Sequence, residues 1–101
     1  MAITDTYIRA AEHGLSYSGL KTADAAIKSA PGKVFWLTIS DASASAIQLN
    51  DSTNDSGTDL WGLILTTNTY YHFNFDPPIE FATGIFLDVS TGTPDVYIGY
   101  I

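Results

Sequence analysis

Residues Leu60–Phe75 read LWGLILTTNTYYHFNF, and this stretch decides the fold class. Leu60–Thr66 is an apolar run with the branched and aromatic side chains that strands favour, and Thr67-Asn68 supplies turn chemistry. Thr69–Phe75 then alternates, because Tyr71, Phe73 and Phe75 fall on one face of a strand. Tyr70, His72 and Asn74 fall on the other face. The stretch therefore predicts two strands separated by a tight turn.

On both sides of this stretch, short apolar runs bounded by turn residues predict further strands. They lie at 33–40, 46–50, 79–81, 84–89 and 95–101, with a weaker strand at 16–21. The alanines of 23–29 also permit a helix, but 25–29 fits a strand that ends in a turn better. We expect Asp76-Pro77-Pro78 to break the chain between two of them. A spacing of roughly 8–12 residues is typical of a sandwich or barrel, and no segment is long enough for the crossover helices of a parallel sheet. The prediction is an all-β, antiparallel β-sandwich of seven to eight strands, in jelly-roll or immunoglobulin-like order.

The first 24 residues have a different composition from the rest of the chain. The segment 5–13, DTYIRAAEH, is compatible with a short helix that Thr4 or Asp5 would cap and Gly14 would close. A helix of about nine residues is marginal unless it packs on something, so an extended arm remains an alternative. The expected organisation is an N-terminal arm or short helix at 1–24, followed by a β-sandwich domain at 25–101.

Charge is distributed unevenly along the chain. The formal net charge is −7, and the basic residues Arg9, Lys21, Lys28 and Lys33 all precede eight acidic residues that lie after position 33. Nucleic-acid binding and attachment to anionic membranes both depend on Lys and Arg, so we expect neither partner. No apolar run approaches the ~20 residues of a membrane-spanning helix, and the N-terminus has no secretory signal pattern. Without cysteine there is no disulfide or Cys-based zinc site.

Several predicted strands are apolar on both faces, which a two-layer sandwich does not require. In 34–39, for example, Val34 and Trp36 share one face while Phe35 and Leu37 share the other. The second apolar face needs a cover, either residues 1–30 of the same chain or a neighbouring subunit. The second alternative predicts a set of interface residues. These are Tyr7, Ile8, Phe35, Trp36, Trp61, Tyr97, Tyr100 and Ile101.

Catalytic and metal-binding patterns are weak. His72 lies near Asp76 but lacks a nucleophile-elbow motif, so a histidine bonded to a strand neighbour is the favoured interpretation. The polar loop 51–59 has oxygen ligands but departs from the EF-hand template in its glycine and its final acid. Asp76 and Glu80 alone do not make a glycosidase. We therefore predict no enzymatic activity, no catalytic residue, no metal and no cofactor.

Strand aromatics offer a different possibility. Tyr70, Tyr71, Trp36 and Trp61 are the residues that could stack on a sugar. Core or interface packing is the commoner role of such side chains.

Four pieces of sequence resemble small β-sandwich structural proteins of tailed bacteriophages, the decoration or cement-like proteins. They are Ile27–Val34 (IKSAPGKV), Ile47–Ser52 (IQLNDS), Ser56-Gly57-Thr58 and Phe75–Ile85 (FDPPIEFATGI). The likeness covers roughly residues 25–101 and consists of strand lengths and corners, so no functional residue is carried over from it.

The resemblance implies a non-enzymatic virion protein, made in the host cytoplasm. Its expected role is capsid decoration as a homotrimer that contacts the major capsid protein or other virion proteins. The alternative function is a carbohydrate- or receptor-binding module of a phage tail or fibre.

Overall fold

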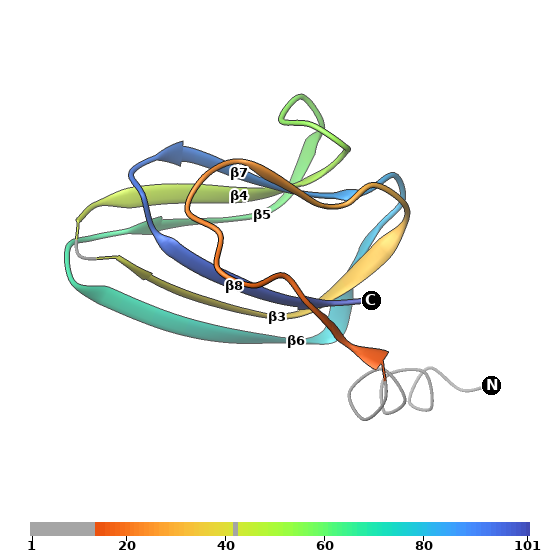
Figure 1. The fold of residues 1–101 in the computed structure, drawn as a ribbon, viewed down its shortest axis with the longest axis horizontal. Helices are drawn as coiled ribbons and strands as arrows, with labels where there is room; N and C mark the ends of the chain where they lie inside the picture. Colours follow the sequence, from red (N-terminus) through yellow and green to blue (C-terminus); the bar gives the residue numbers. More distant parts are fainter. Residues whose placement is uncertain (1–13, 42) are drawn as a thin grey trace.

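In the computed structural model, which describes residues 14–41 and 43–101, eight strands form two four-stranded antiparallel sheets packed face to face (Figure 1). The strands are β1 Ser16–Tyr17, β2 Ala25–Lys28, β3 Gly32–Asp41, β4 Ser45–Asp51, β5 Thr58–Leu65, β6 Thr69–Phe81, β7 Ile85–Thr91 and β8 Asp95–Tyr100. The predicted all-β sandwich is confirmed. In the part of the chain described, no helix is long and apolar enough to cross a bilayer.

The strand order identifies the topology. Sheet A has the order β1-β8-β3-β6 and sheet B the order β2-β7-β4-β5, so nearly every connection passes from one sheet to the other. In an immunoglobulin-like sandwich the first two strands pair within one sheet, whereas β1 and β2 lie in different sheets here. The interleaved order is that of an eight-stranded jelly roll, which consists of two Greek keys.

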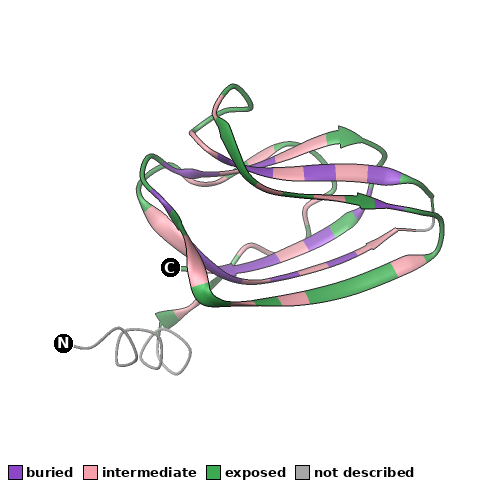
Figure 2. Cartoon of the chain, turned by 180° about the vertical axis from the view of Figure 1, so that it is seen from behind, coloured by how far each residue is buried: buried purple, intermediate pink, exposed green. Residues whose placement is uncertain are grey.

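The core lies between the sheets, and alternation along each strand builds it. Leu37 and Ile39 of β3 face Ile47 and Leu49 of β4, and all four side chains are completely buried. Figure 2 shows these buried positions alternating with partly exposed ones along the inner strands. Each such side chain contributes about 1.5–3 kcal/mol of hydrophobic stabilisation.

The predicted break at Asp76-Pro77-Pro78 is wrong, because β6 continues through these residues to Phe81. Proline removes a ladder hydrogen bond, and sheets tolerate it at an edge strand or a bulge. Both conditions hold, since β6 is the edge of sheet A and its pairing with β3 shifts register between Val34 and Trp36. The short strand expected at 79–81 is therefore the end of β6.

Strand pairing in sheet A begins before residue 25. Ser16 and Tyr17 pair with Tyr100 and Gly99, and Lys21 forms a bridge with Val96. The segment expected to form a helix at 5–13, with Tyr7 and Ile8, lies outside the described residues.

Candidate functional site

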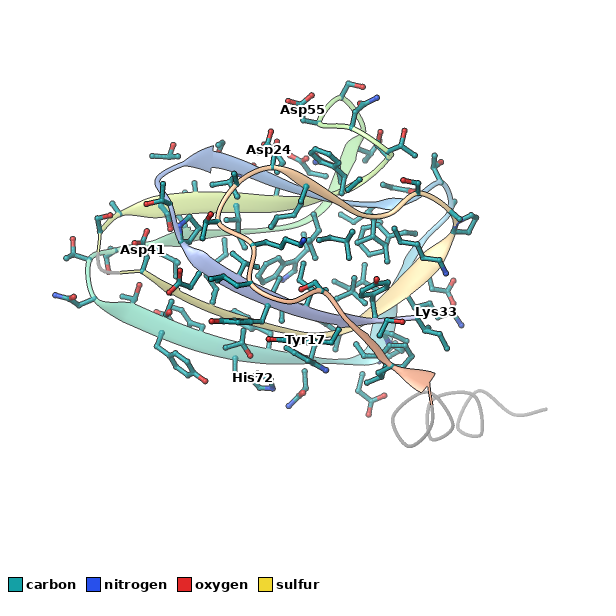
Figure 3. All side chains as sticks on the ribbon, viewed as in Figure 1. Tyr17, Asp24, Lys33, Asp41, Asp55 and His72 are labelled. Atoms are coloured by element: carbon teal, nitrogen blue, oxygen red, sulfur yellow. The ribbon has the colours of Figure 1, made fainter. Side chains whose placement is uncertain are left out.

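The outer face of sheet A carries two adjacent rows of aromatic and polar side chains. Strand pairing places Tyr17, Gly99, Trp36 and Asn74 in one row, and Tyr97, Thr38 and His72 in the next. We call the six side chains the aromatic face: Tyr17, Trp36, Thr38, His72, Asn74 and Tyr97. Tyr17 and His72 lie on this side of the sandwich, remote from sheet B (Figure 3).

The rings of the aromatic face contact one another. The Tyr17 ring centroid lies 6.2 Å from that of Trp36 and 6.3 Å from that of Tyr97, in stacked orientations. Trp36 and His72 have centroids 5.9 Å apart. Each of the four strands of sheet A contributes one ring to this layer. The relative solvent exposure of Tyr17 is 61%.

A short polar chain runs beside these rings. Thr38 Oγ1 and His72 Nδ1 are 2.6 Å apart, and His72 Nε2 is 3.1 Å from Asn74 Oδ1. The connectivity is that of a hydroxyl, a base and an orienting amide. Acyl transfer would also need backbone N–H donors at an oxyanion hole, but β3 is paired on both sides along Trp36–Ser40. The prediction of a histidine bonded to strand neighbours is confirmed.

A polar cleft of about 520 Å³ opens at one end of the sandwich. Its lining comes from the ends of β3, β6 and β8 and from the loops beside them. The residues are Ser40, Asp41, Ser43, Asn68, Thr69, Tyr70, Thr93 and Asp95. Ser40 pairs with both Tyr70 and Asp95, so the cleft forms the next row beyond Tyr97, Thr38 and His72 on the same sheet.

The walls of the cleft are held by local hydrogen bonds. Asp41 Oδ1 accepts the backbone N–H of Ser43 at 3.0 Å, and the Thr69 hydroxyl donates to the Thr66 carbonyl at 2.6 Å. Asn68 has φ of 58°, in the left-handed region that Asn enters more readily than most residues. The turn predicted at Thr67-Asn68 therefore forms one wall, although it joins two sheets instead of two neighbouring strands.

Sheet B presents a contrasting outer surface. Burial raises the pKa of Asp88, and the nearby carboxylates of Asp24, Asp55 and Asp59 raise it further. Asp24 also accepts the Val89 N–H at 2.7 Å. Figure 3 shows Asp24 and Asp55 on the side opposite Tyr17 and His72. One side of the sandwich is therefore acidic, whereas the aromatic face holds no Asp, Glu, Lys or Arg side chain.

The residues predicted to form an interface do not share one surface. Trp36 and Tyr97 belong to the aromatic face, and Ile101 is 39% exposed. Phe35 is only 3% exposed within the single chain.

Trp61 and Tyr100 pack against the core instead. The Trp61 ring centroid is 5.1 Å from that of Phe73 and 5.6 Å from that of Phe75. Although β5 is apolar on both faces in sequence, only one face is covered, since Leu60 and Ile64 are exposed while Leu65 is buried.

The four aromatic residues suggested for a sugar platform are likewise divided. Tyr70 is on the outer side with Trp36, whereas Tyr71 stacks on Phe73 with a centroid separation of 5.8 Å. Trp61 lies with Phe73 as described above. Only Tyr70, with 67% exposure, lies at the cleft.

The acidic candidates have structural partners. Glu80 Oε1 is 3.5 Å from Lys33 Nζ. In the loop after β4, Asp51 accepts the Thr83 N–H and Asn54 accepts the Ser56 N–H. Among residues 14–41 and 43–101, no group of three or more His, Asp or Glu side chains is arranged to hold a metal ion.

Sequence reasoning missed the roles of Tyr17, Thr38, Asn74 and Gly99. A glycine inside a strand marks a close approach of another group, and Gly99 within DVYIGYI was the available signal. The cleft had no signal, because its polar residues are spread from Ser40 to Asp95 and only the jelly-roll topology joins them.

The fold and the aromatic face define a small jelly-roll protein with an aromatic patch free of Asp, Glu, Lys and Arg on sheet A and an acidic surface on the opposite side. Comparison with protein-family models, with characterised proteins and with solved structures finds no match.

Proposed function

We propose that this protein is a non-enzymatic structural component of a tailed-phage virion, which decorates the capsid. The aromatic face would be its docking surface, against sister subunits and the major capsid protein. The proposal combines the resemblance over residues 25–101 with the composition of this surface. The jelly roll is also an architecture that viral capsid proteins use.

One observation carries the proposal. The aromatic face is rich in Tyr and Trp and lacks Asp, Glu, Lys and Arg, in a chain whose formal net charge is −7. The centres of protein–protein interfaces are depleted in charge and enriched in these aromatic residues. A surface built to face water alone would share the acidic character of sheet B, so the selective absence of charge favours a protein partner.

Stacking among the rings supports the same function. Trp36 is held between Tyr17 and His72 before any partner binds, so little side-chain entropy is lost on docking. The acidic surface of sheet B would remain outward on the particle and keep it soluble.

The test is the mass in solution of the wild type and of Trp36→Asp, measured by light scattering after size exclusion. We expect a wild-type trimer near three times 10.9 kDa and a Trp36→Asp monomer. Ile64→Asp is the matched control, because Ile64 is 80% exposed on the other sheet. It adds the same charge to a surface that the proposal leaves free of contacts.

A wild-type monomer, or a trimer that survives Trp36→Asp, would contradict docking through the aromatic face. Thermal melting of both variants completes the test, because a Trp36→Asp chain that melts like Ile64→Asp has lost assembly and not its fold.

A further inference from the structure

The cleft at the end of the sandwich has the composition of a ligand site. Its volume of about 520 Å³ lies within the roughly 300–1,000 Å³ of small-molecule sites. It receives residues from three loops, which join β3 to β4, β5 to β6 and β7 to β8 (Figure 1). Loops held on a rigid sheet are the usual location of binding residues.

The polar groups of the cleft are suited to hydroxyl recognition. The carboxylate of Asp95 accepts hydrogen bonds, while the hydroxyls of Ser40, Thr93 and Tyr70 both donate and accept. Within the described part of the chain, no protein partner occupies the Asp95 carboxylate or the Tyr70 hydroxyl. These groups are therefore available to a ligand.

Tyr70 adds an apolar surface to this polar set. Its side chain is 67% exposed and lines the cleft. An aromatic ring beside hydrogen-bonding groups can take the C–H face of a sugar ring while the edge of the sugar meets the polar side chains. A purely ionic ligand would make no use of that ring.

Charge narrows the ligand class. The lining includes Asp41 and Asp95 but no Lys, Arg or His. Phosphates, uronic acids and sialic acids are anionic and would find no Lys, Arg or His in the lining to pair with, so they are disfavoured.

We propose that this cleft binds a neutral pyranose sugar, with Tyr70 stacked on the sugar ring and Asp95 accepting hydrogen bonds from its hydroxyls. The cleft lies one row beyond the aromatic face on the same sheet, and none of its lining residues belongs to that face.

The experiment is an NMR titration of the ¹⁵N-labelled protein. The probes are four neutral methyl pyranosides, of glucose, galactose, mannose and N-acetylglucosamine, with N-acetylneuraminic acid as the charged comparison. We expect at least one neutral pyranoside to shift the backbone amide signals of the lining residues, such as Ser40, Tyr70 and Asp95, with a dissociation constant on the order of 1 mM. The acidic sugar should leave these signals in place.

Three variants assign the response. Tyr70→Ala and Asp95→Asn should each weaken binding at least tenfold. Tyr17→Ala removes an exposed tyrosine from the aromatic face and should leave sugar binding unchanged. Each folded variant is recognised by its unperturbed amide spectrum outside the substituted region.

Two results would overturn the proposal. One is the absence of any cleft shift with all four neutral sugars at about 50 mM, well above the expected dissociation constant. The other is a response that persists in both Tyr70→Ala and Asp95→Asn or that moves to the aromatic face.

Discussion

The indole of Trp36 lies against the backbone of Gly99, so closely that a methyl group on Gly99 would overlap the indole ring. The two residues pair across β3 and β8, and Tyr17 pairs with Gly99 from the other side. Because Gly99 has no side chain, the Trp36 indole can lie over its backbone and stack with the Tyr17 ring. The position of Trp36 in the aromatic face depends on this contact.

Gly99→Ala should therefore displace Trp36 and lower the free energy of unfolding by about 1–3 kcal/mol, the usual cost of overpacking. Urea denaturation measures the loss, and the indole N–H signal of Trp36 in an NMR spectrum reports the displacement. The proposed assembly through the aromatic face should weaken as well.

Gly62→Ala is the matched control, since a Cβ there would make only ordinary contacts, with the nearest atom at 3.4 Å. A Gly99→Ala protein that is as stable as Gly62→Ala, with an unmoved Trp36 signal, would refute the predicted overlap.

The two tryptophans should behave differently when truncated. Trp61 packs edge-on against Phe73 and Phe75 beside the core, so Trp61→Ala should lose about 3 kcal/mol or more of stability. Trp36→Ala removes a ring from the outer face and should lose less. Equal losses in denaturant unfolding would show that the outer ring is as important to the fold as the inner one.

Asp88→Asn should stabilise the protein at neutral pH. Desolvation and the carboxylates of Asp24, Asp55 and Asp59 raise the pKa of Asp88 in the folded state. The folded state therefore favours the protonated acid, and stability is lost as the pH rises through that raised pKa. The neutral amide avoids this loss, by less than about 1 kcal/mol for a partly exposed group.

Thermal melting at neutral and acidic pH checks this prediction. The advantage of Asp88→Asn should be present at about pH 7 and should vanish at about pH 3, where both chains carry an uncharged side chain. An advantage independent of pH would assign the effect to packing.

Asp51 should show the opposite dependence. The backbone N–H groups of Thr83, at 2.7 Å, and Gly84 bond its carboxylate and lower its pKa below the ordinary value of 3.8. Its stabilisation is present above that ordinary pKa and is lost as the pH falls through the lowered one. Asp51→Ala should cost about 1–2 kcal/mol at neutral pH.

Urea unfolding across the acidic range measures this contribution. The stability gap between wild type and Asp51→Ala should narrow towards about pH 2, where the carboxylate is protonated. A gap that stays constant would mean that Asp51 acts through its size and not through its charge.

Much of the fold was accessible from local pattern. The alternation of Tyr71, Phe73 and Phe75 correctly put these residues on one face of β6, and Phe73 and Phe75 pack against the core. The apolar runs located all eight strands, although β6 runs to Phe81 and not to the predicted end at Phe75. These strands could be located because a strand that turns one face to the other sheet shows that face in its own sequence, as hydrophobic residues at every second position. The predicted strand break at 76–78 was wrong because an edge strand tolerates proline, and the sequence does not show that β6 is an edge strand.

The candidate sites were less accessible, since they depend on strand order. Ser40, Tyr70 and Asp95 are neighbours only because β3 lies between β6 and β8. Likewise, Trp36 and Trp61 look equivalent in sequence, but one faces outward and the other packs beside the core. A one-residue change in register reverses such an assignment.

The position of β8 has a consequence for biosynthesis. It lies inside sheet A, between β1 and β3, which are joined to each other only through it. A ribosome-bound chain whose residues 95–100 have not yet emerged cannot complete this sheet. Until then β1 and one edge of β3 lack their pairing partner, β8. Long-range strand pairing of this kind is slow. We expect the exposed strand edges of the nascent chain to need protection from association with other chains until β8 emerges.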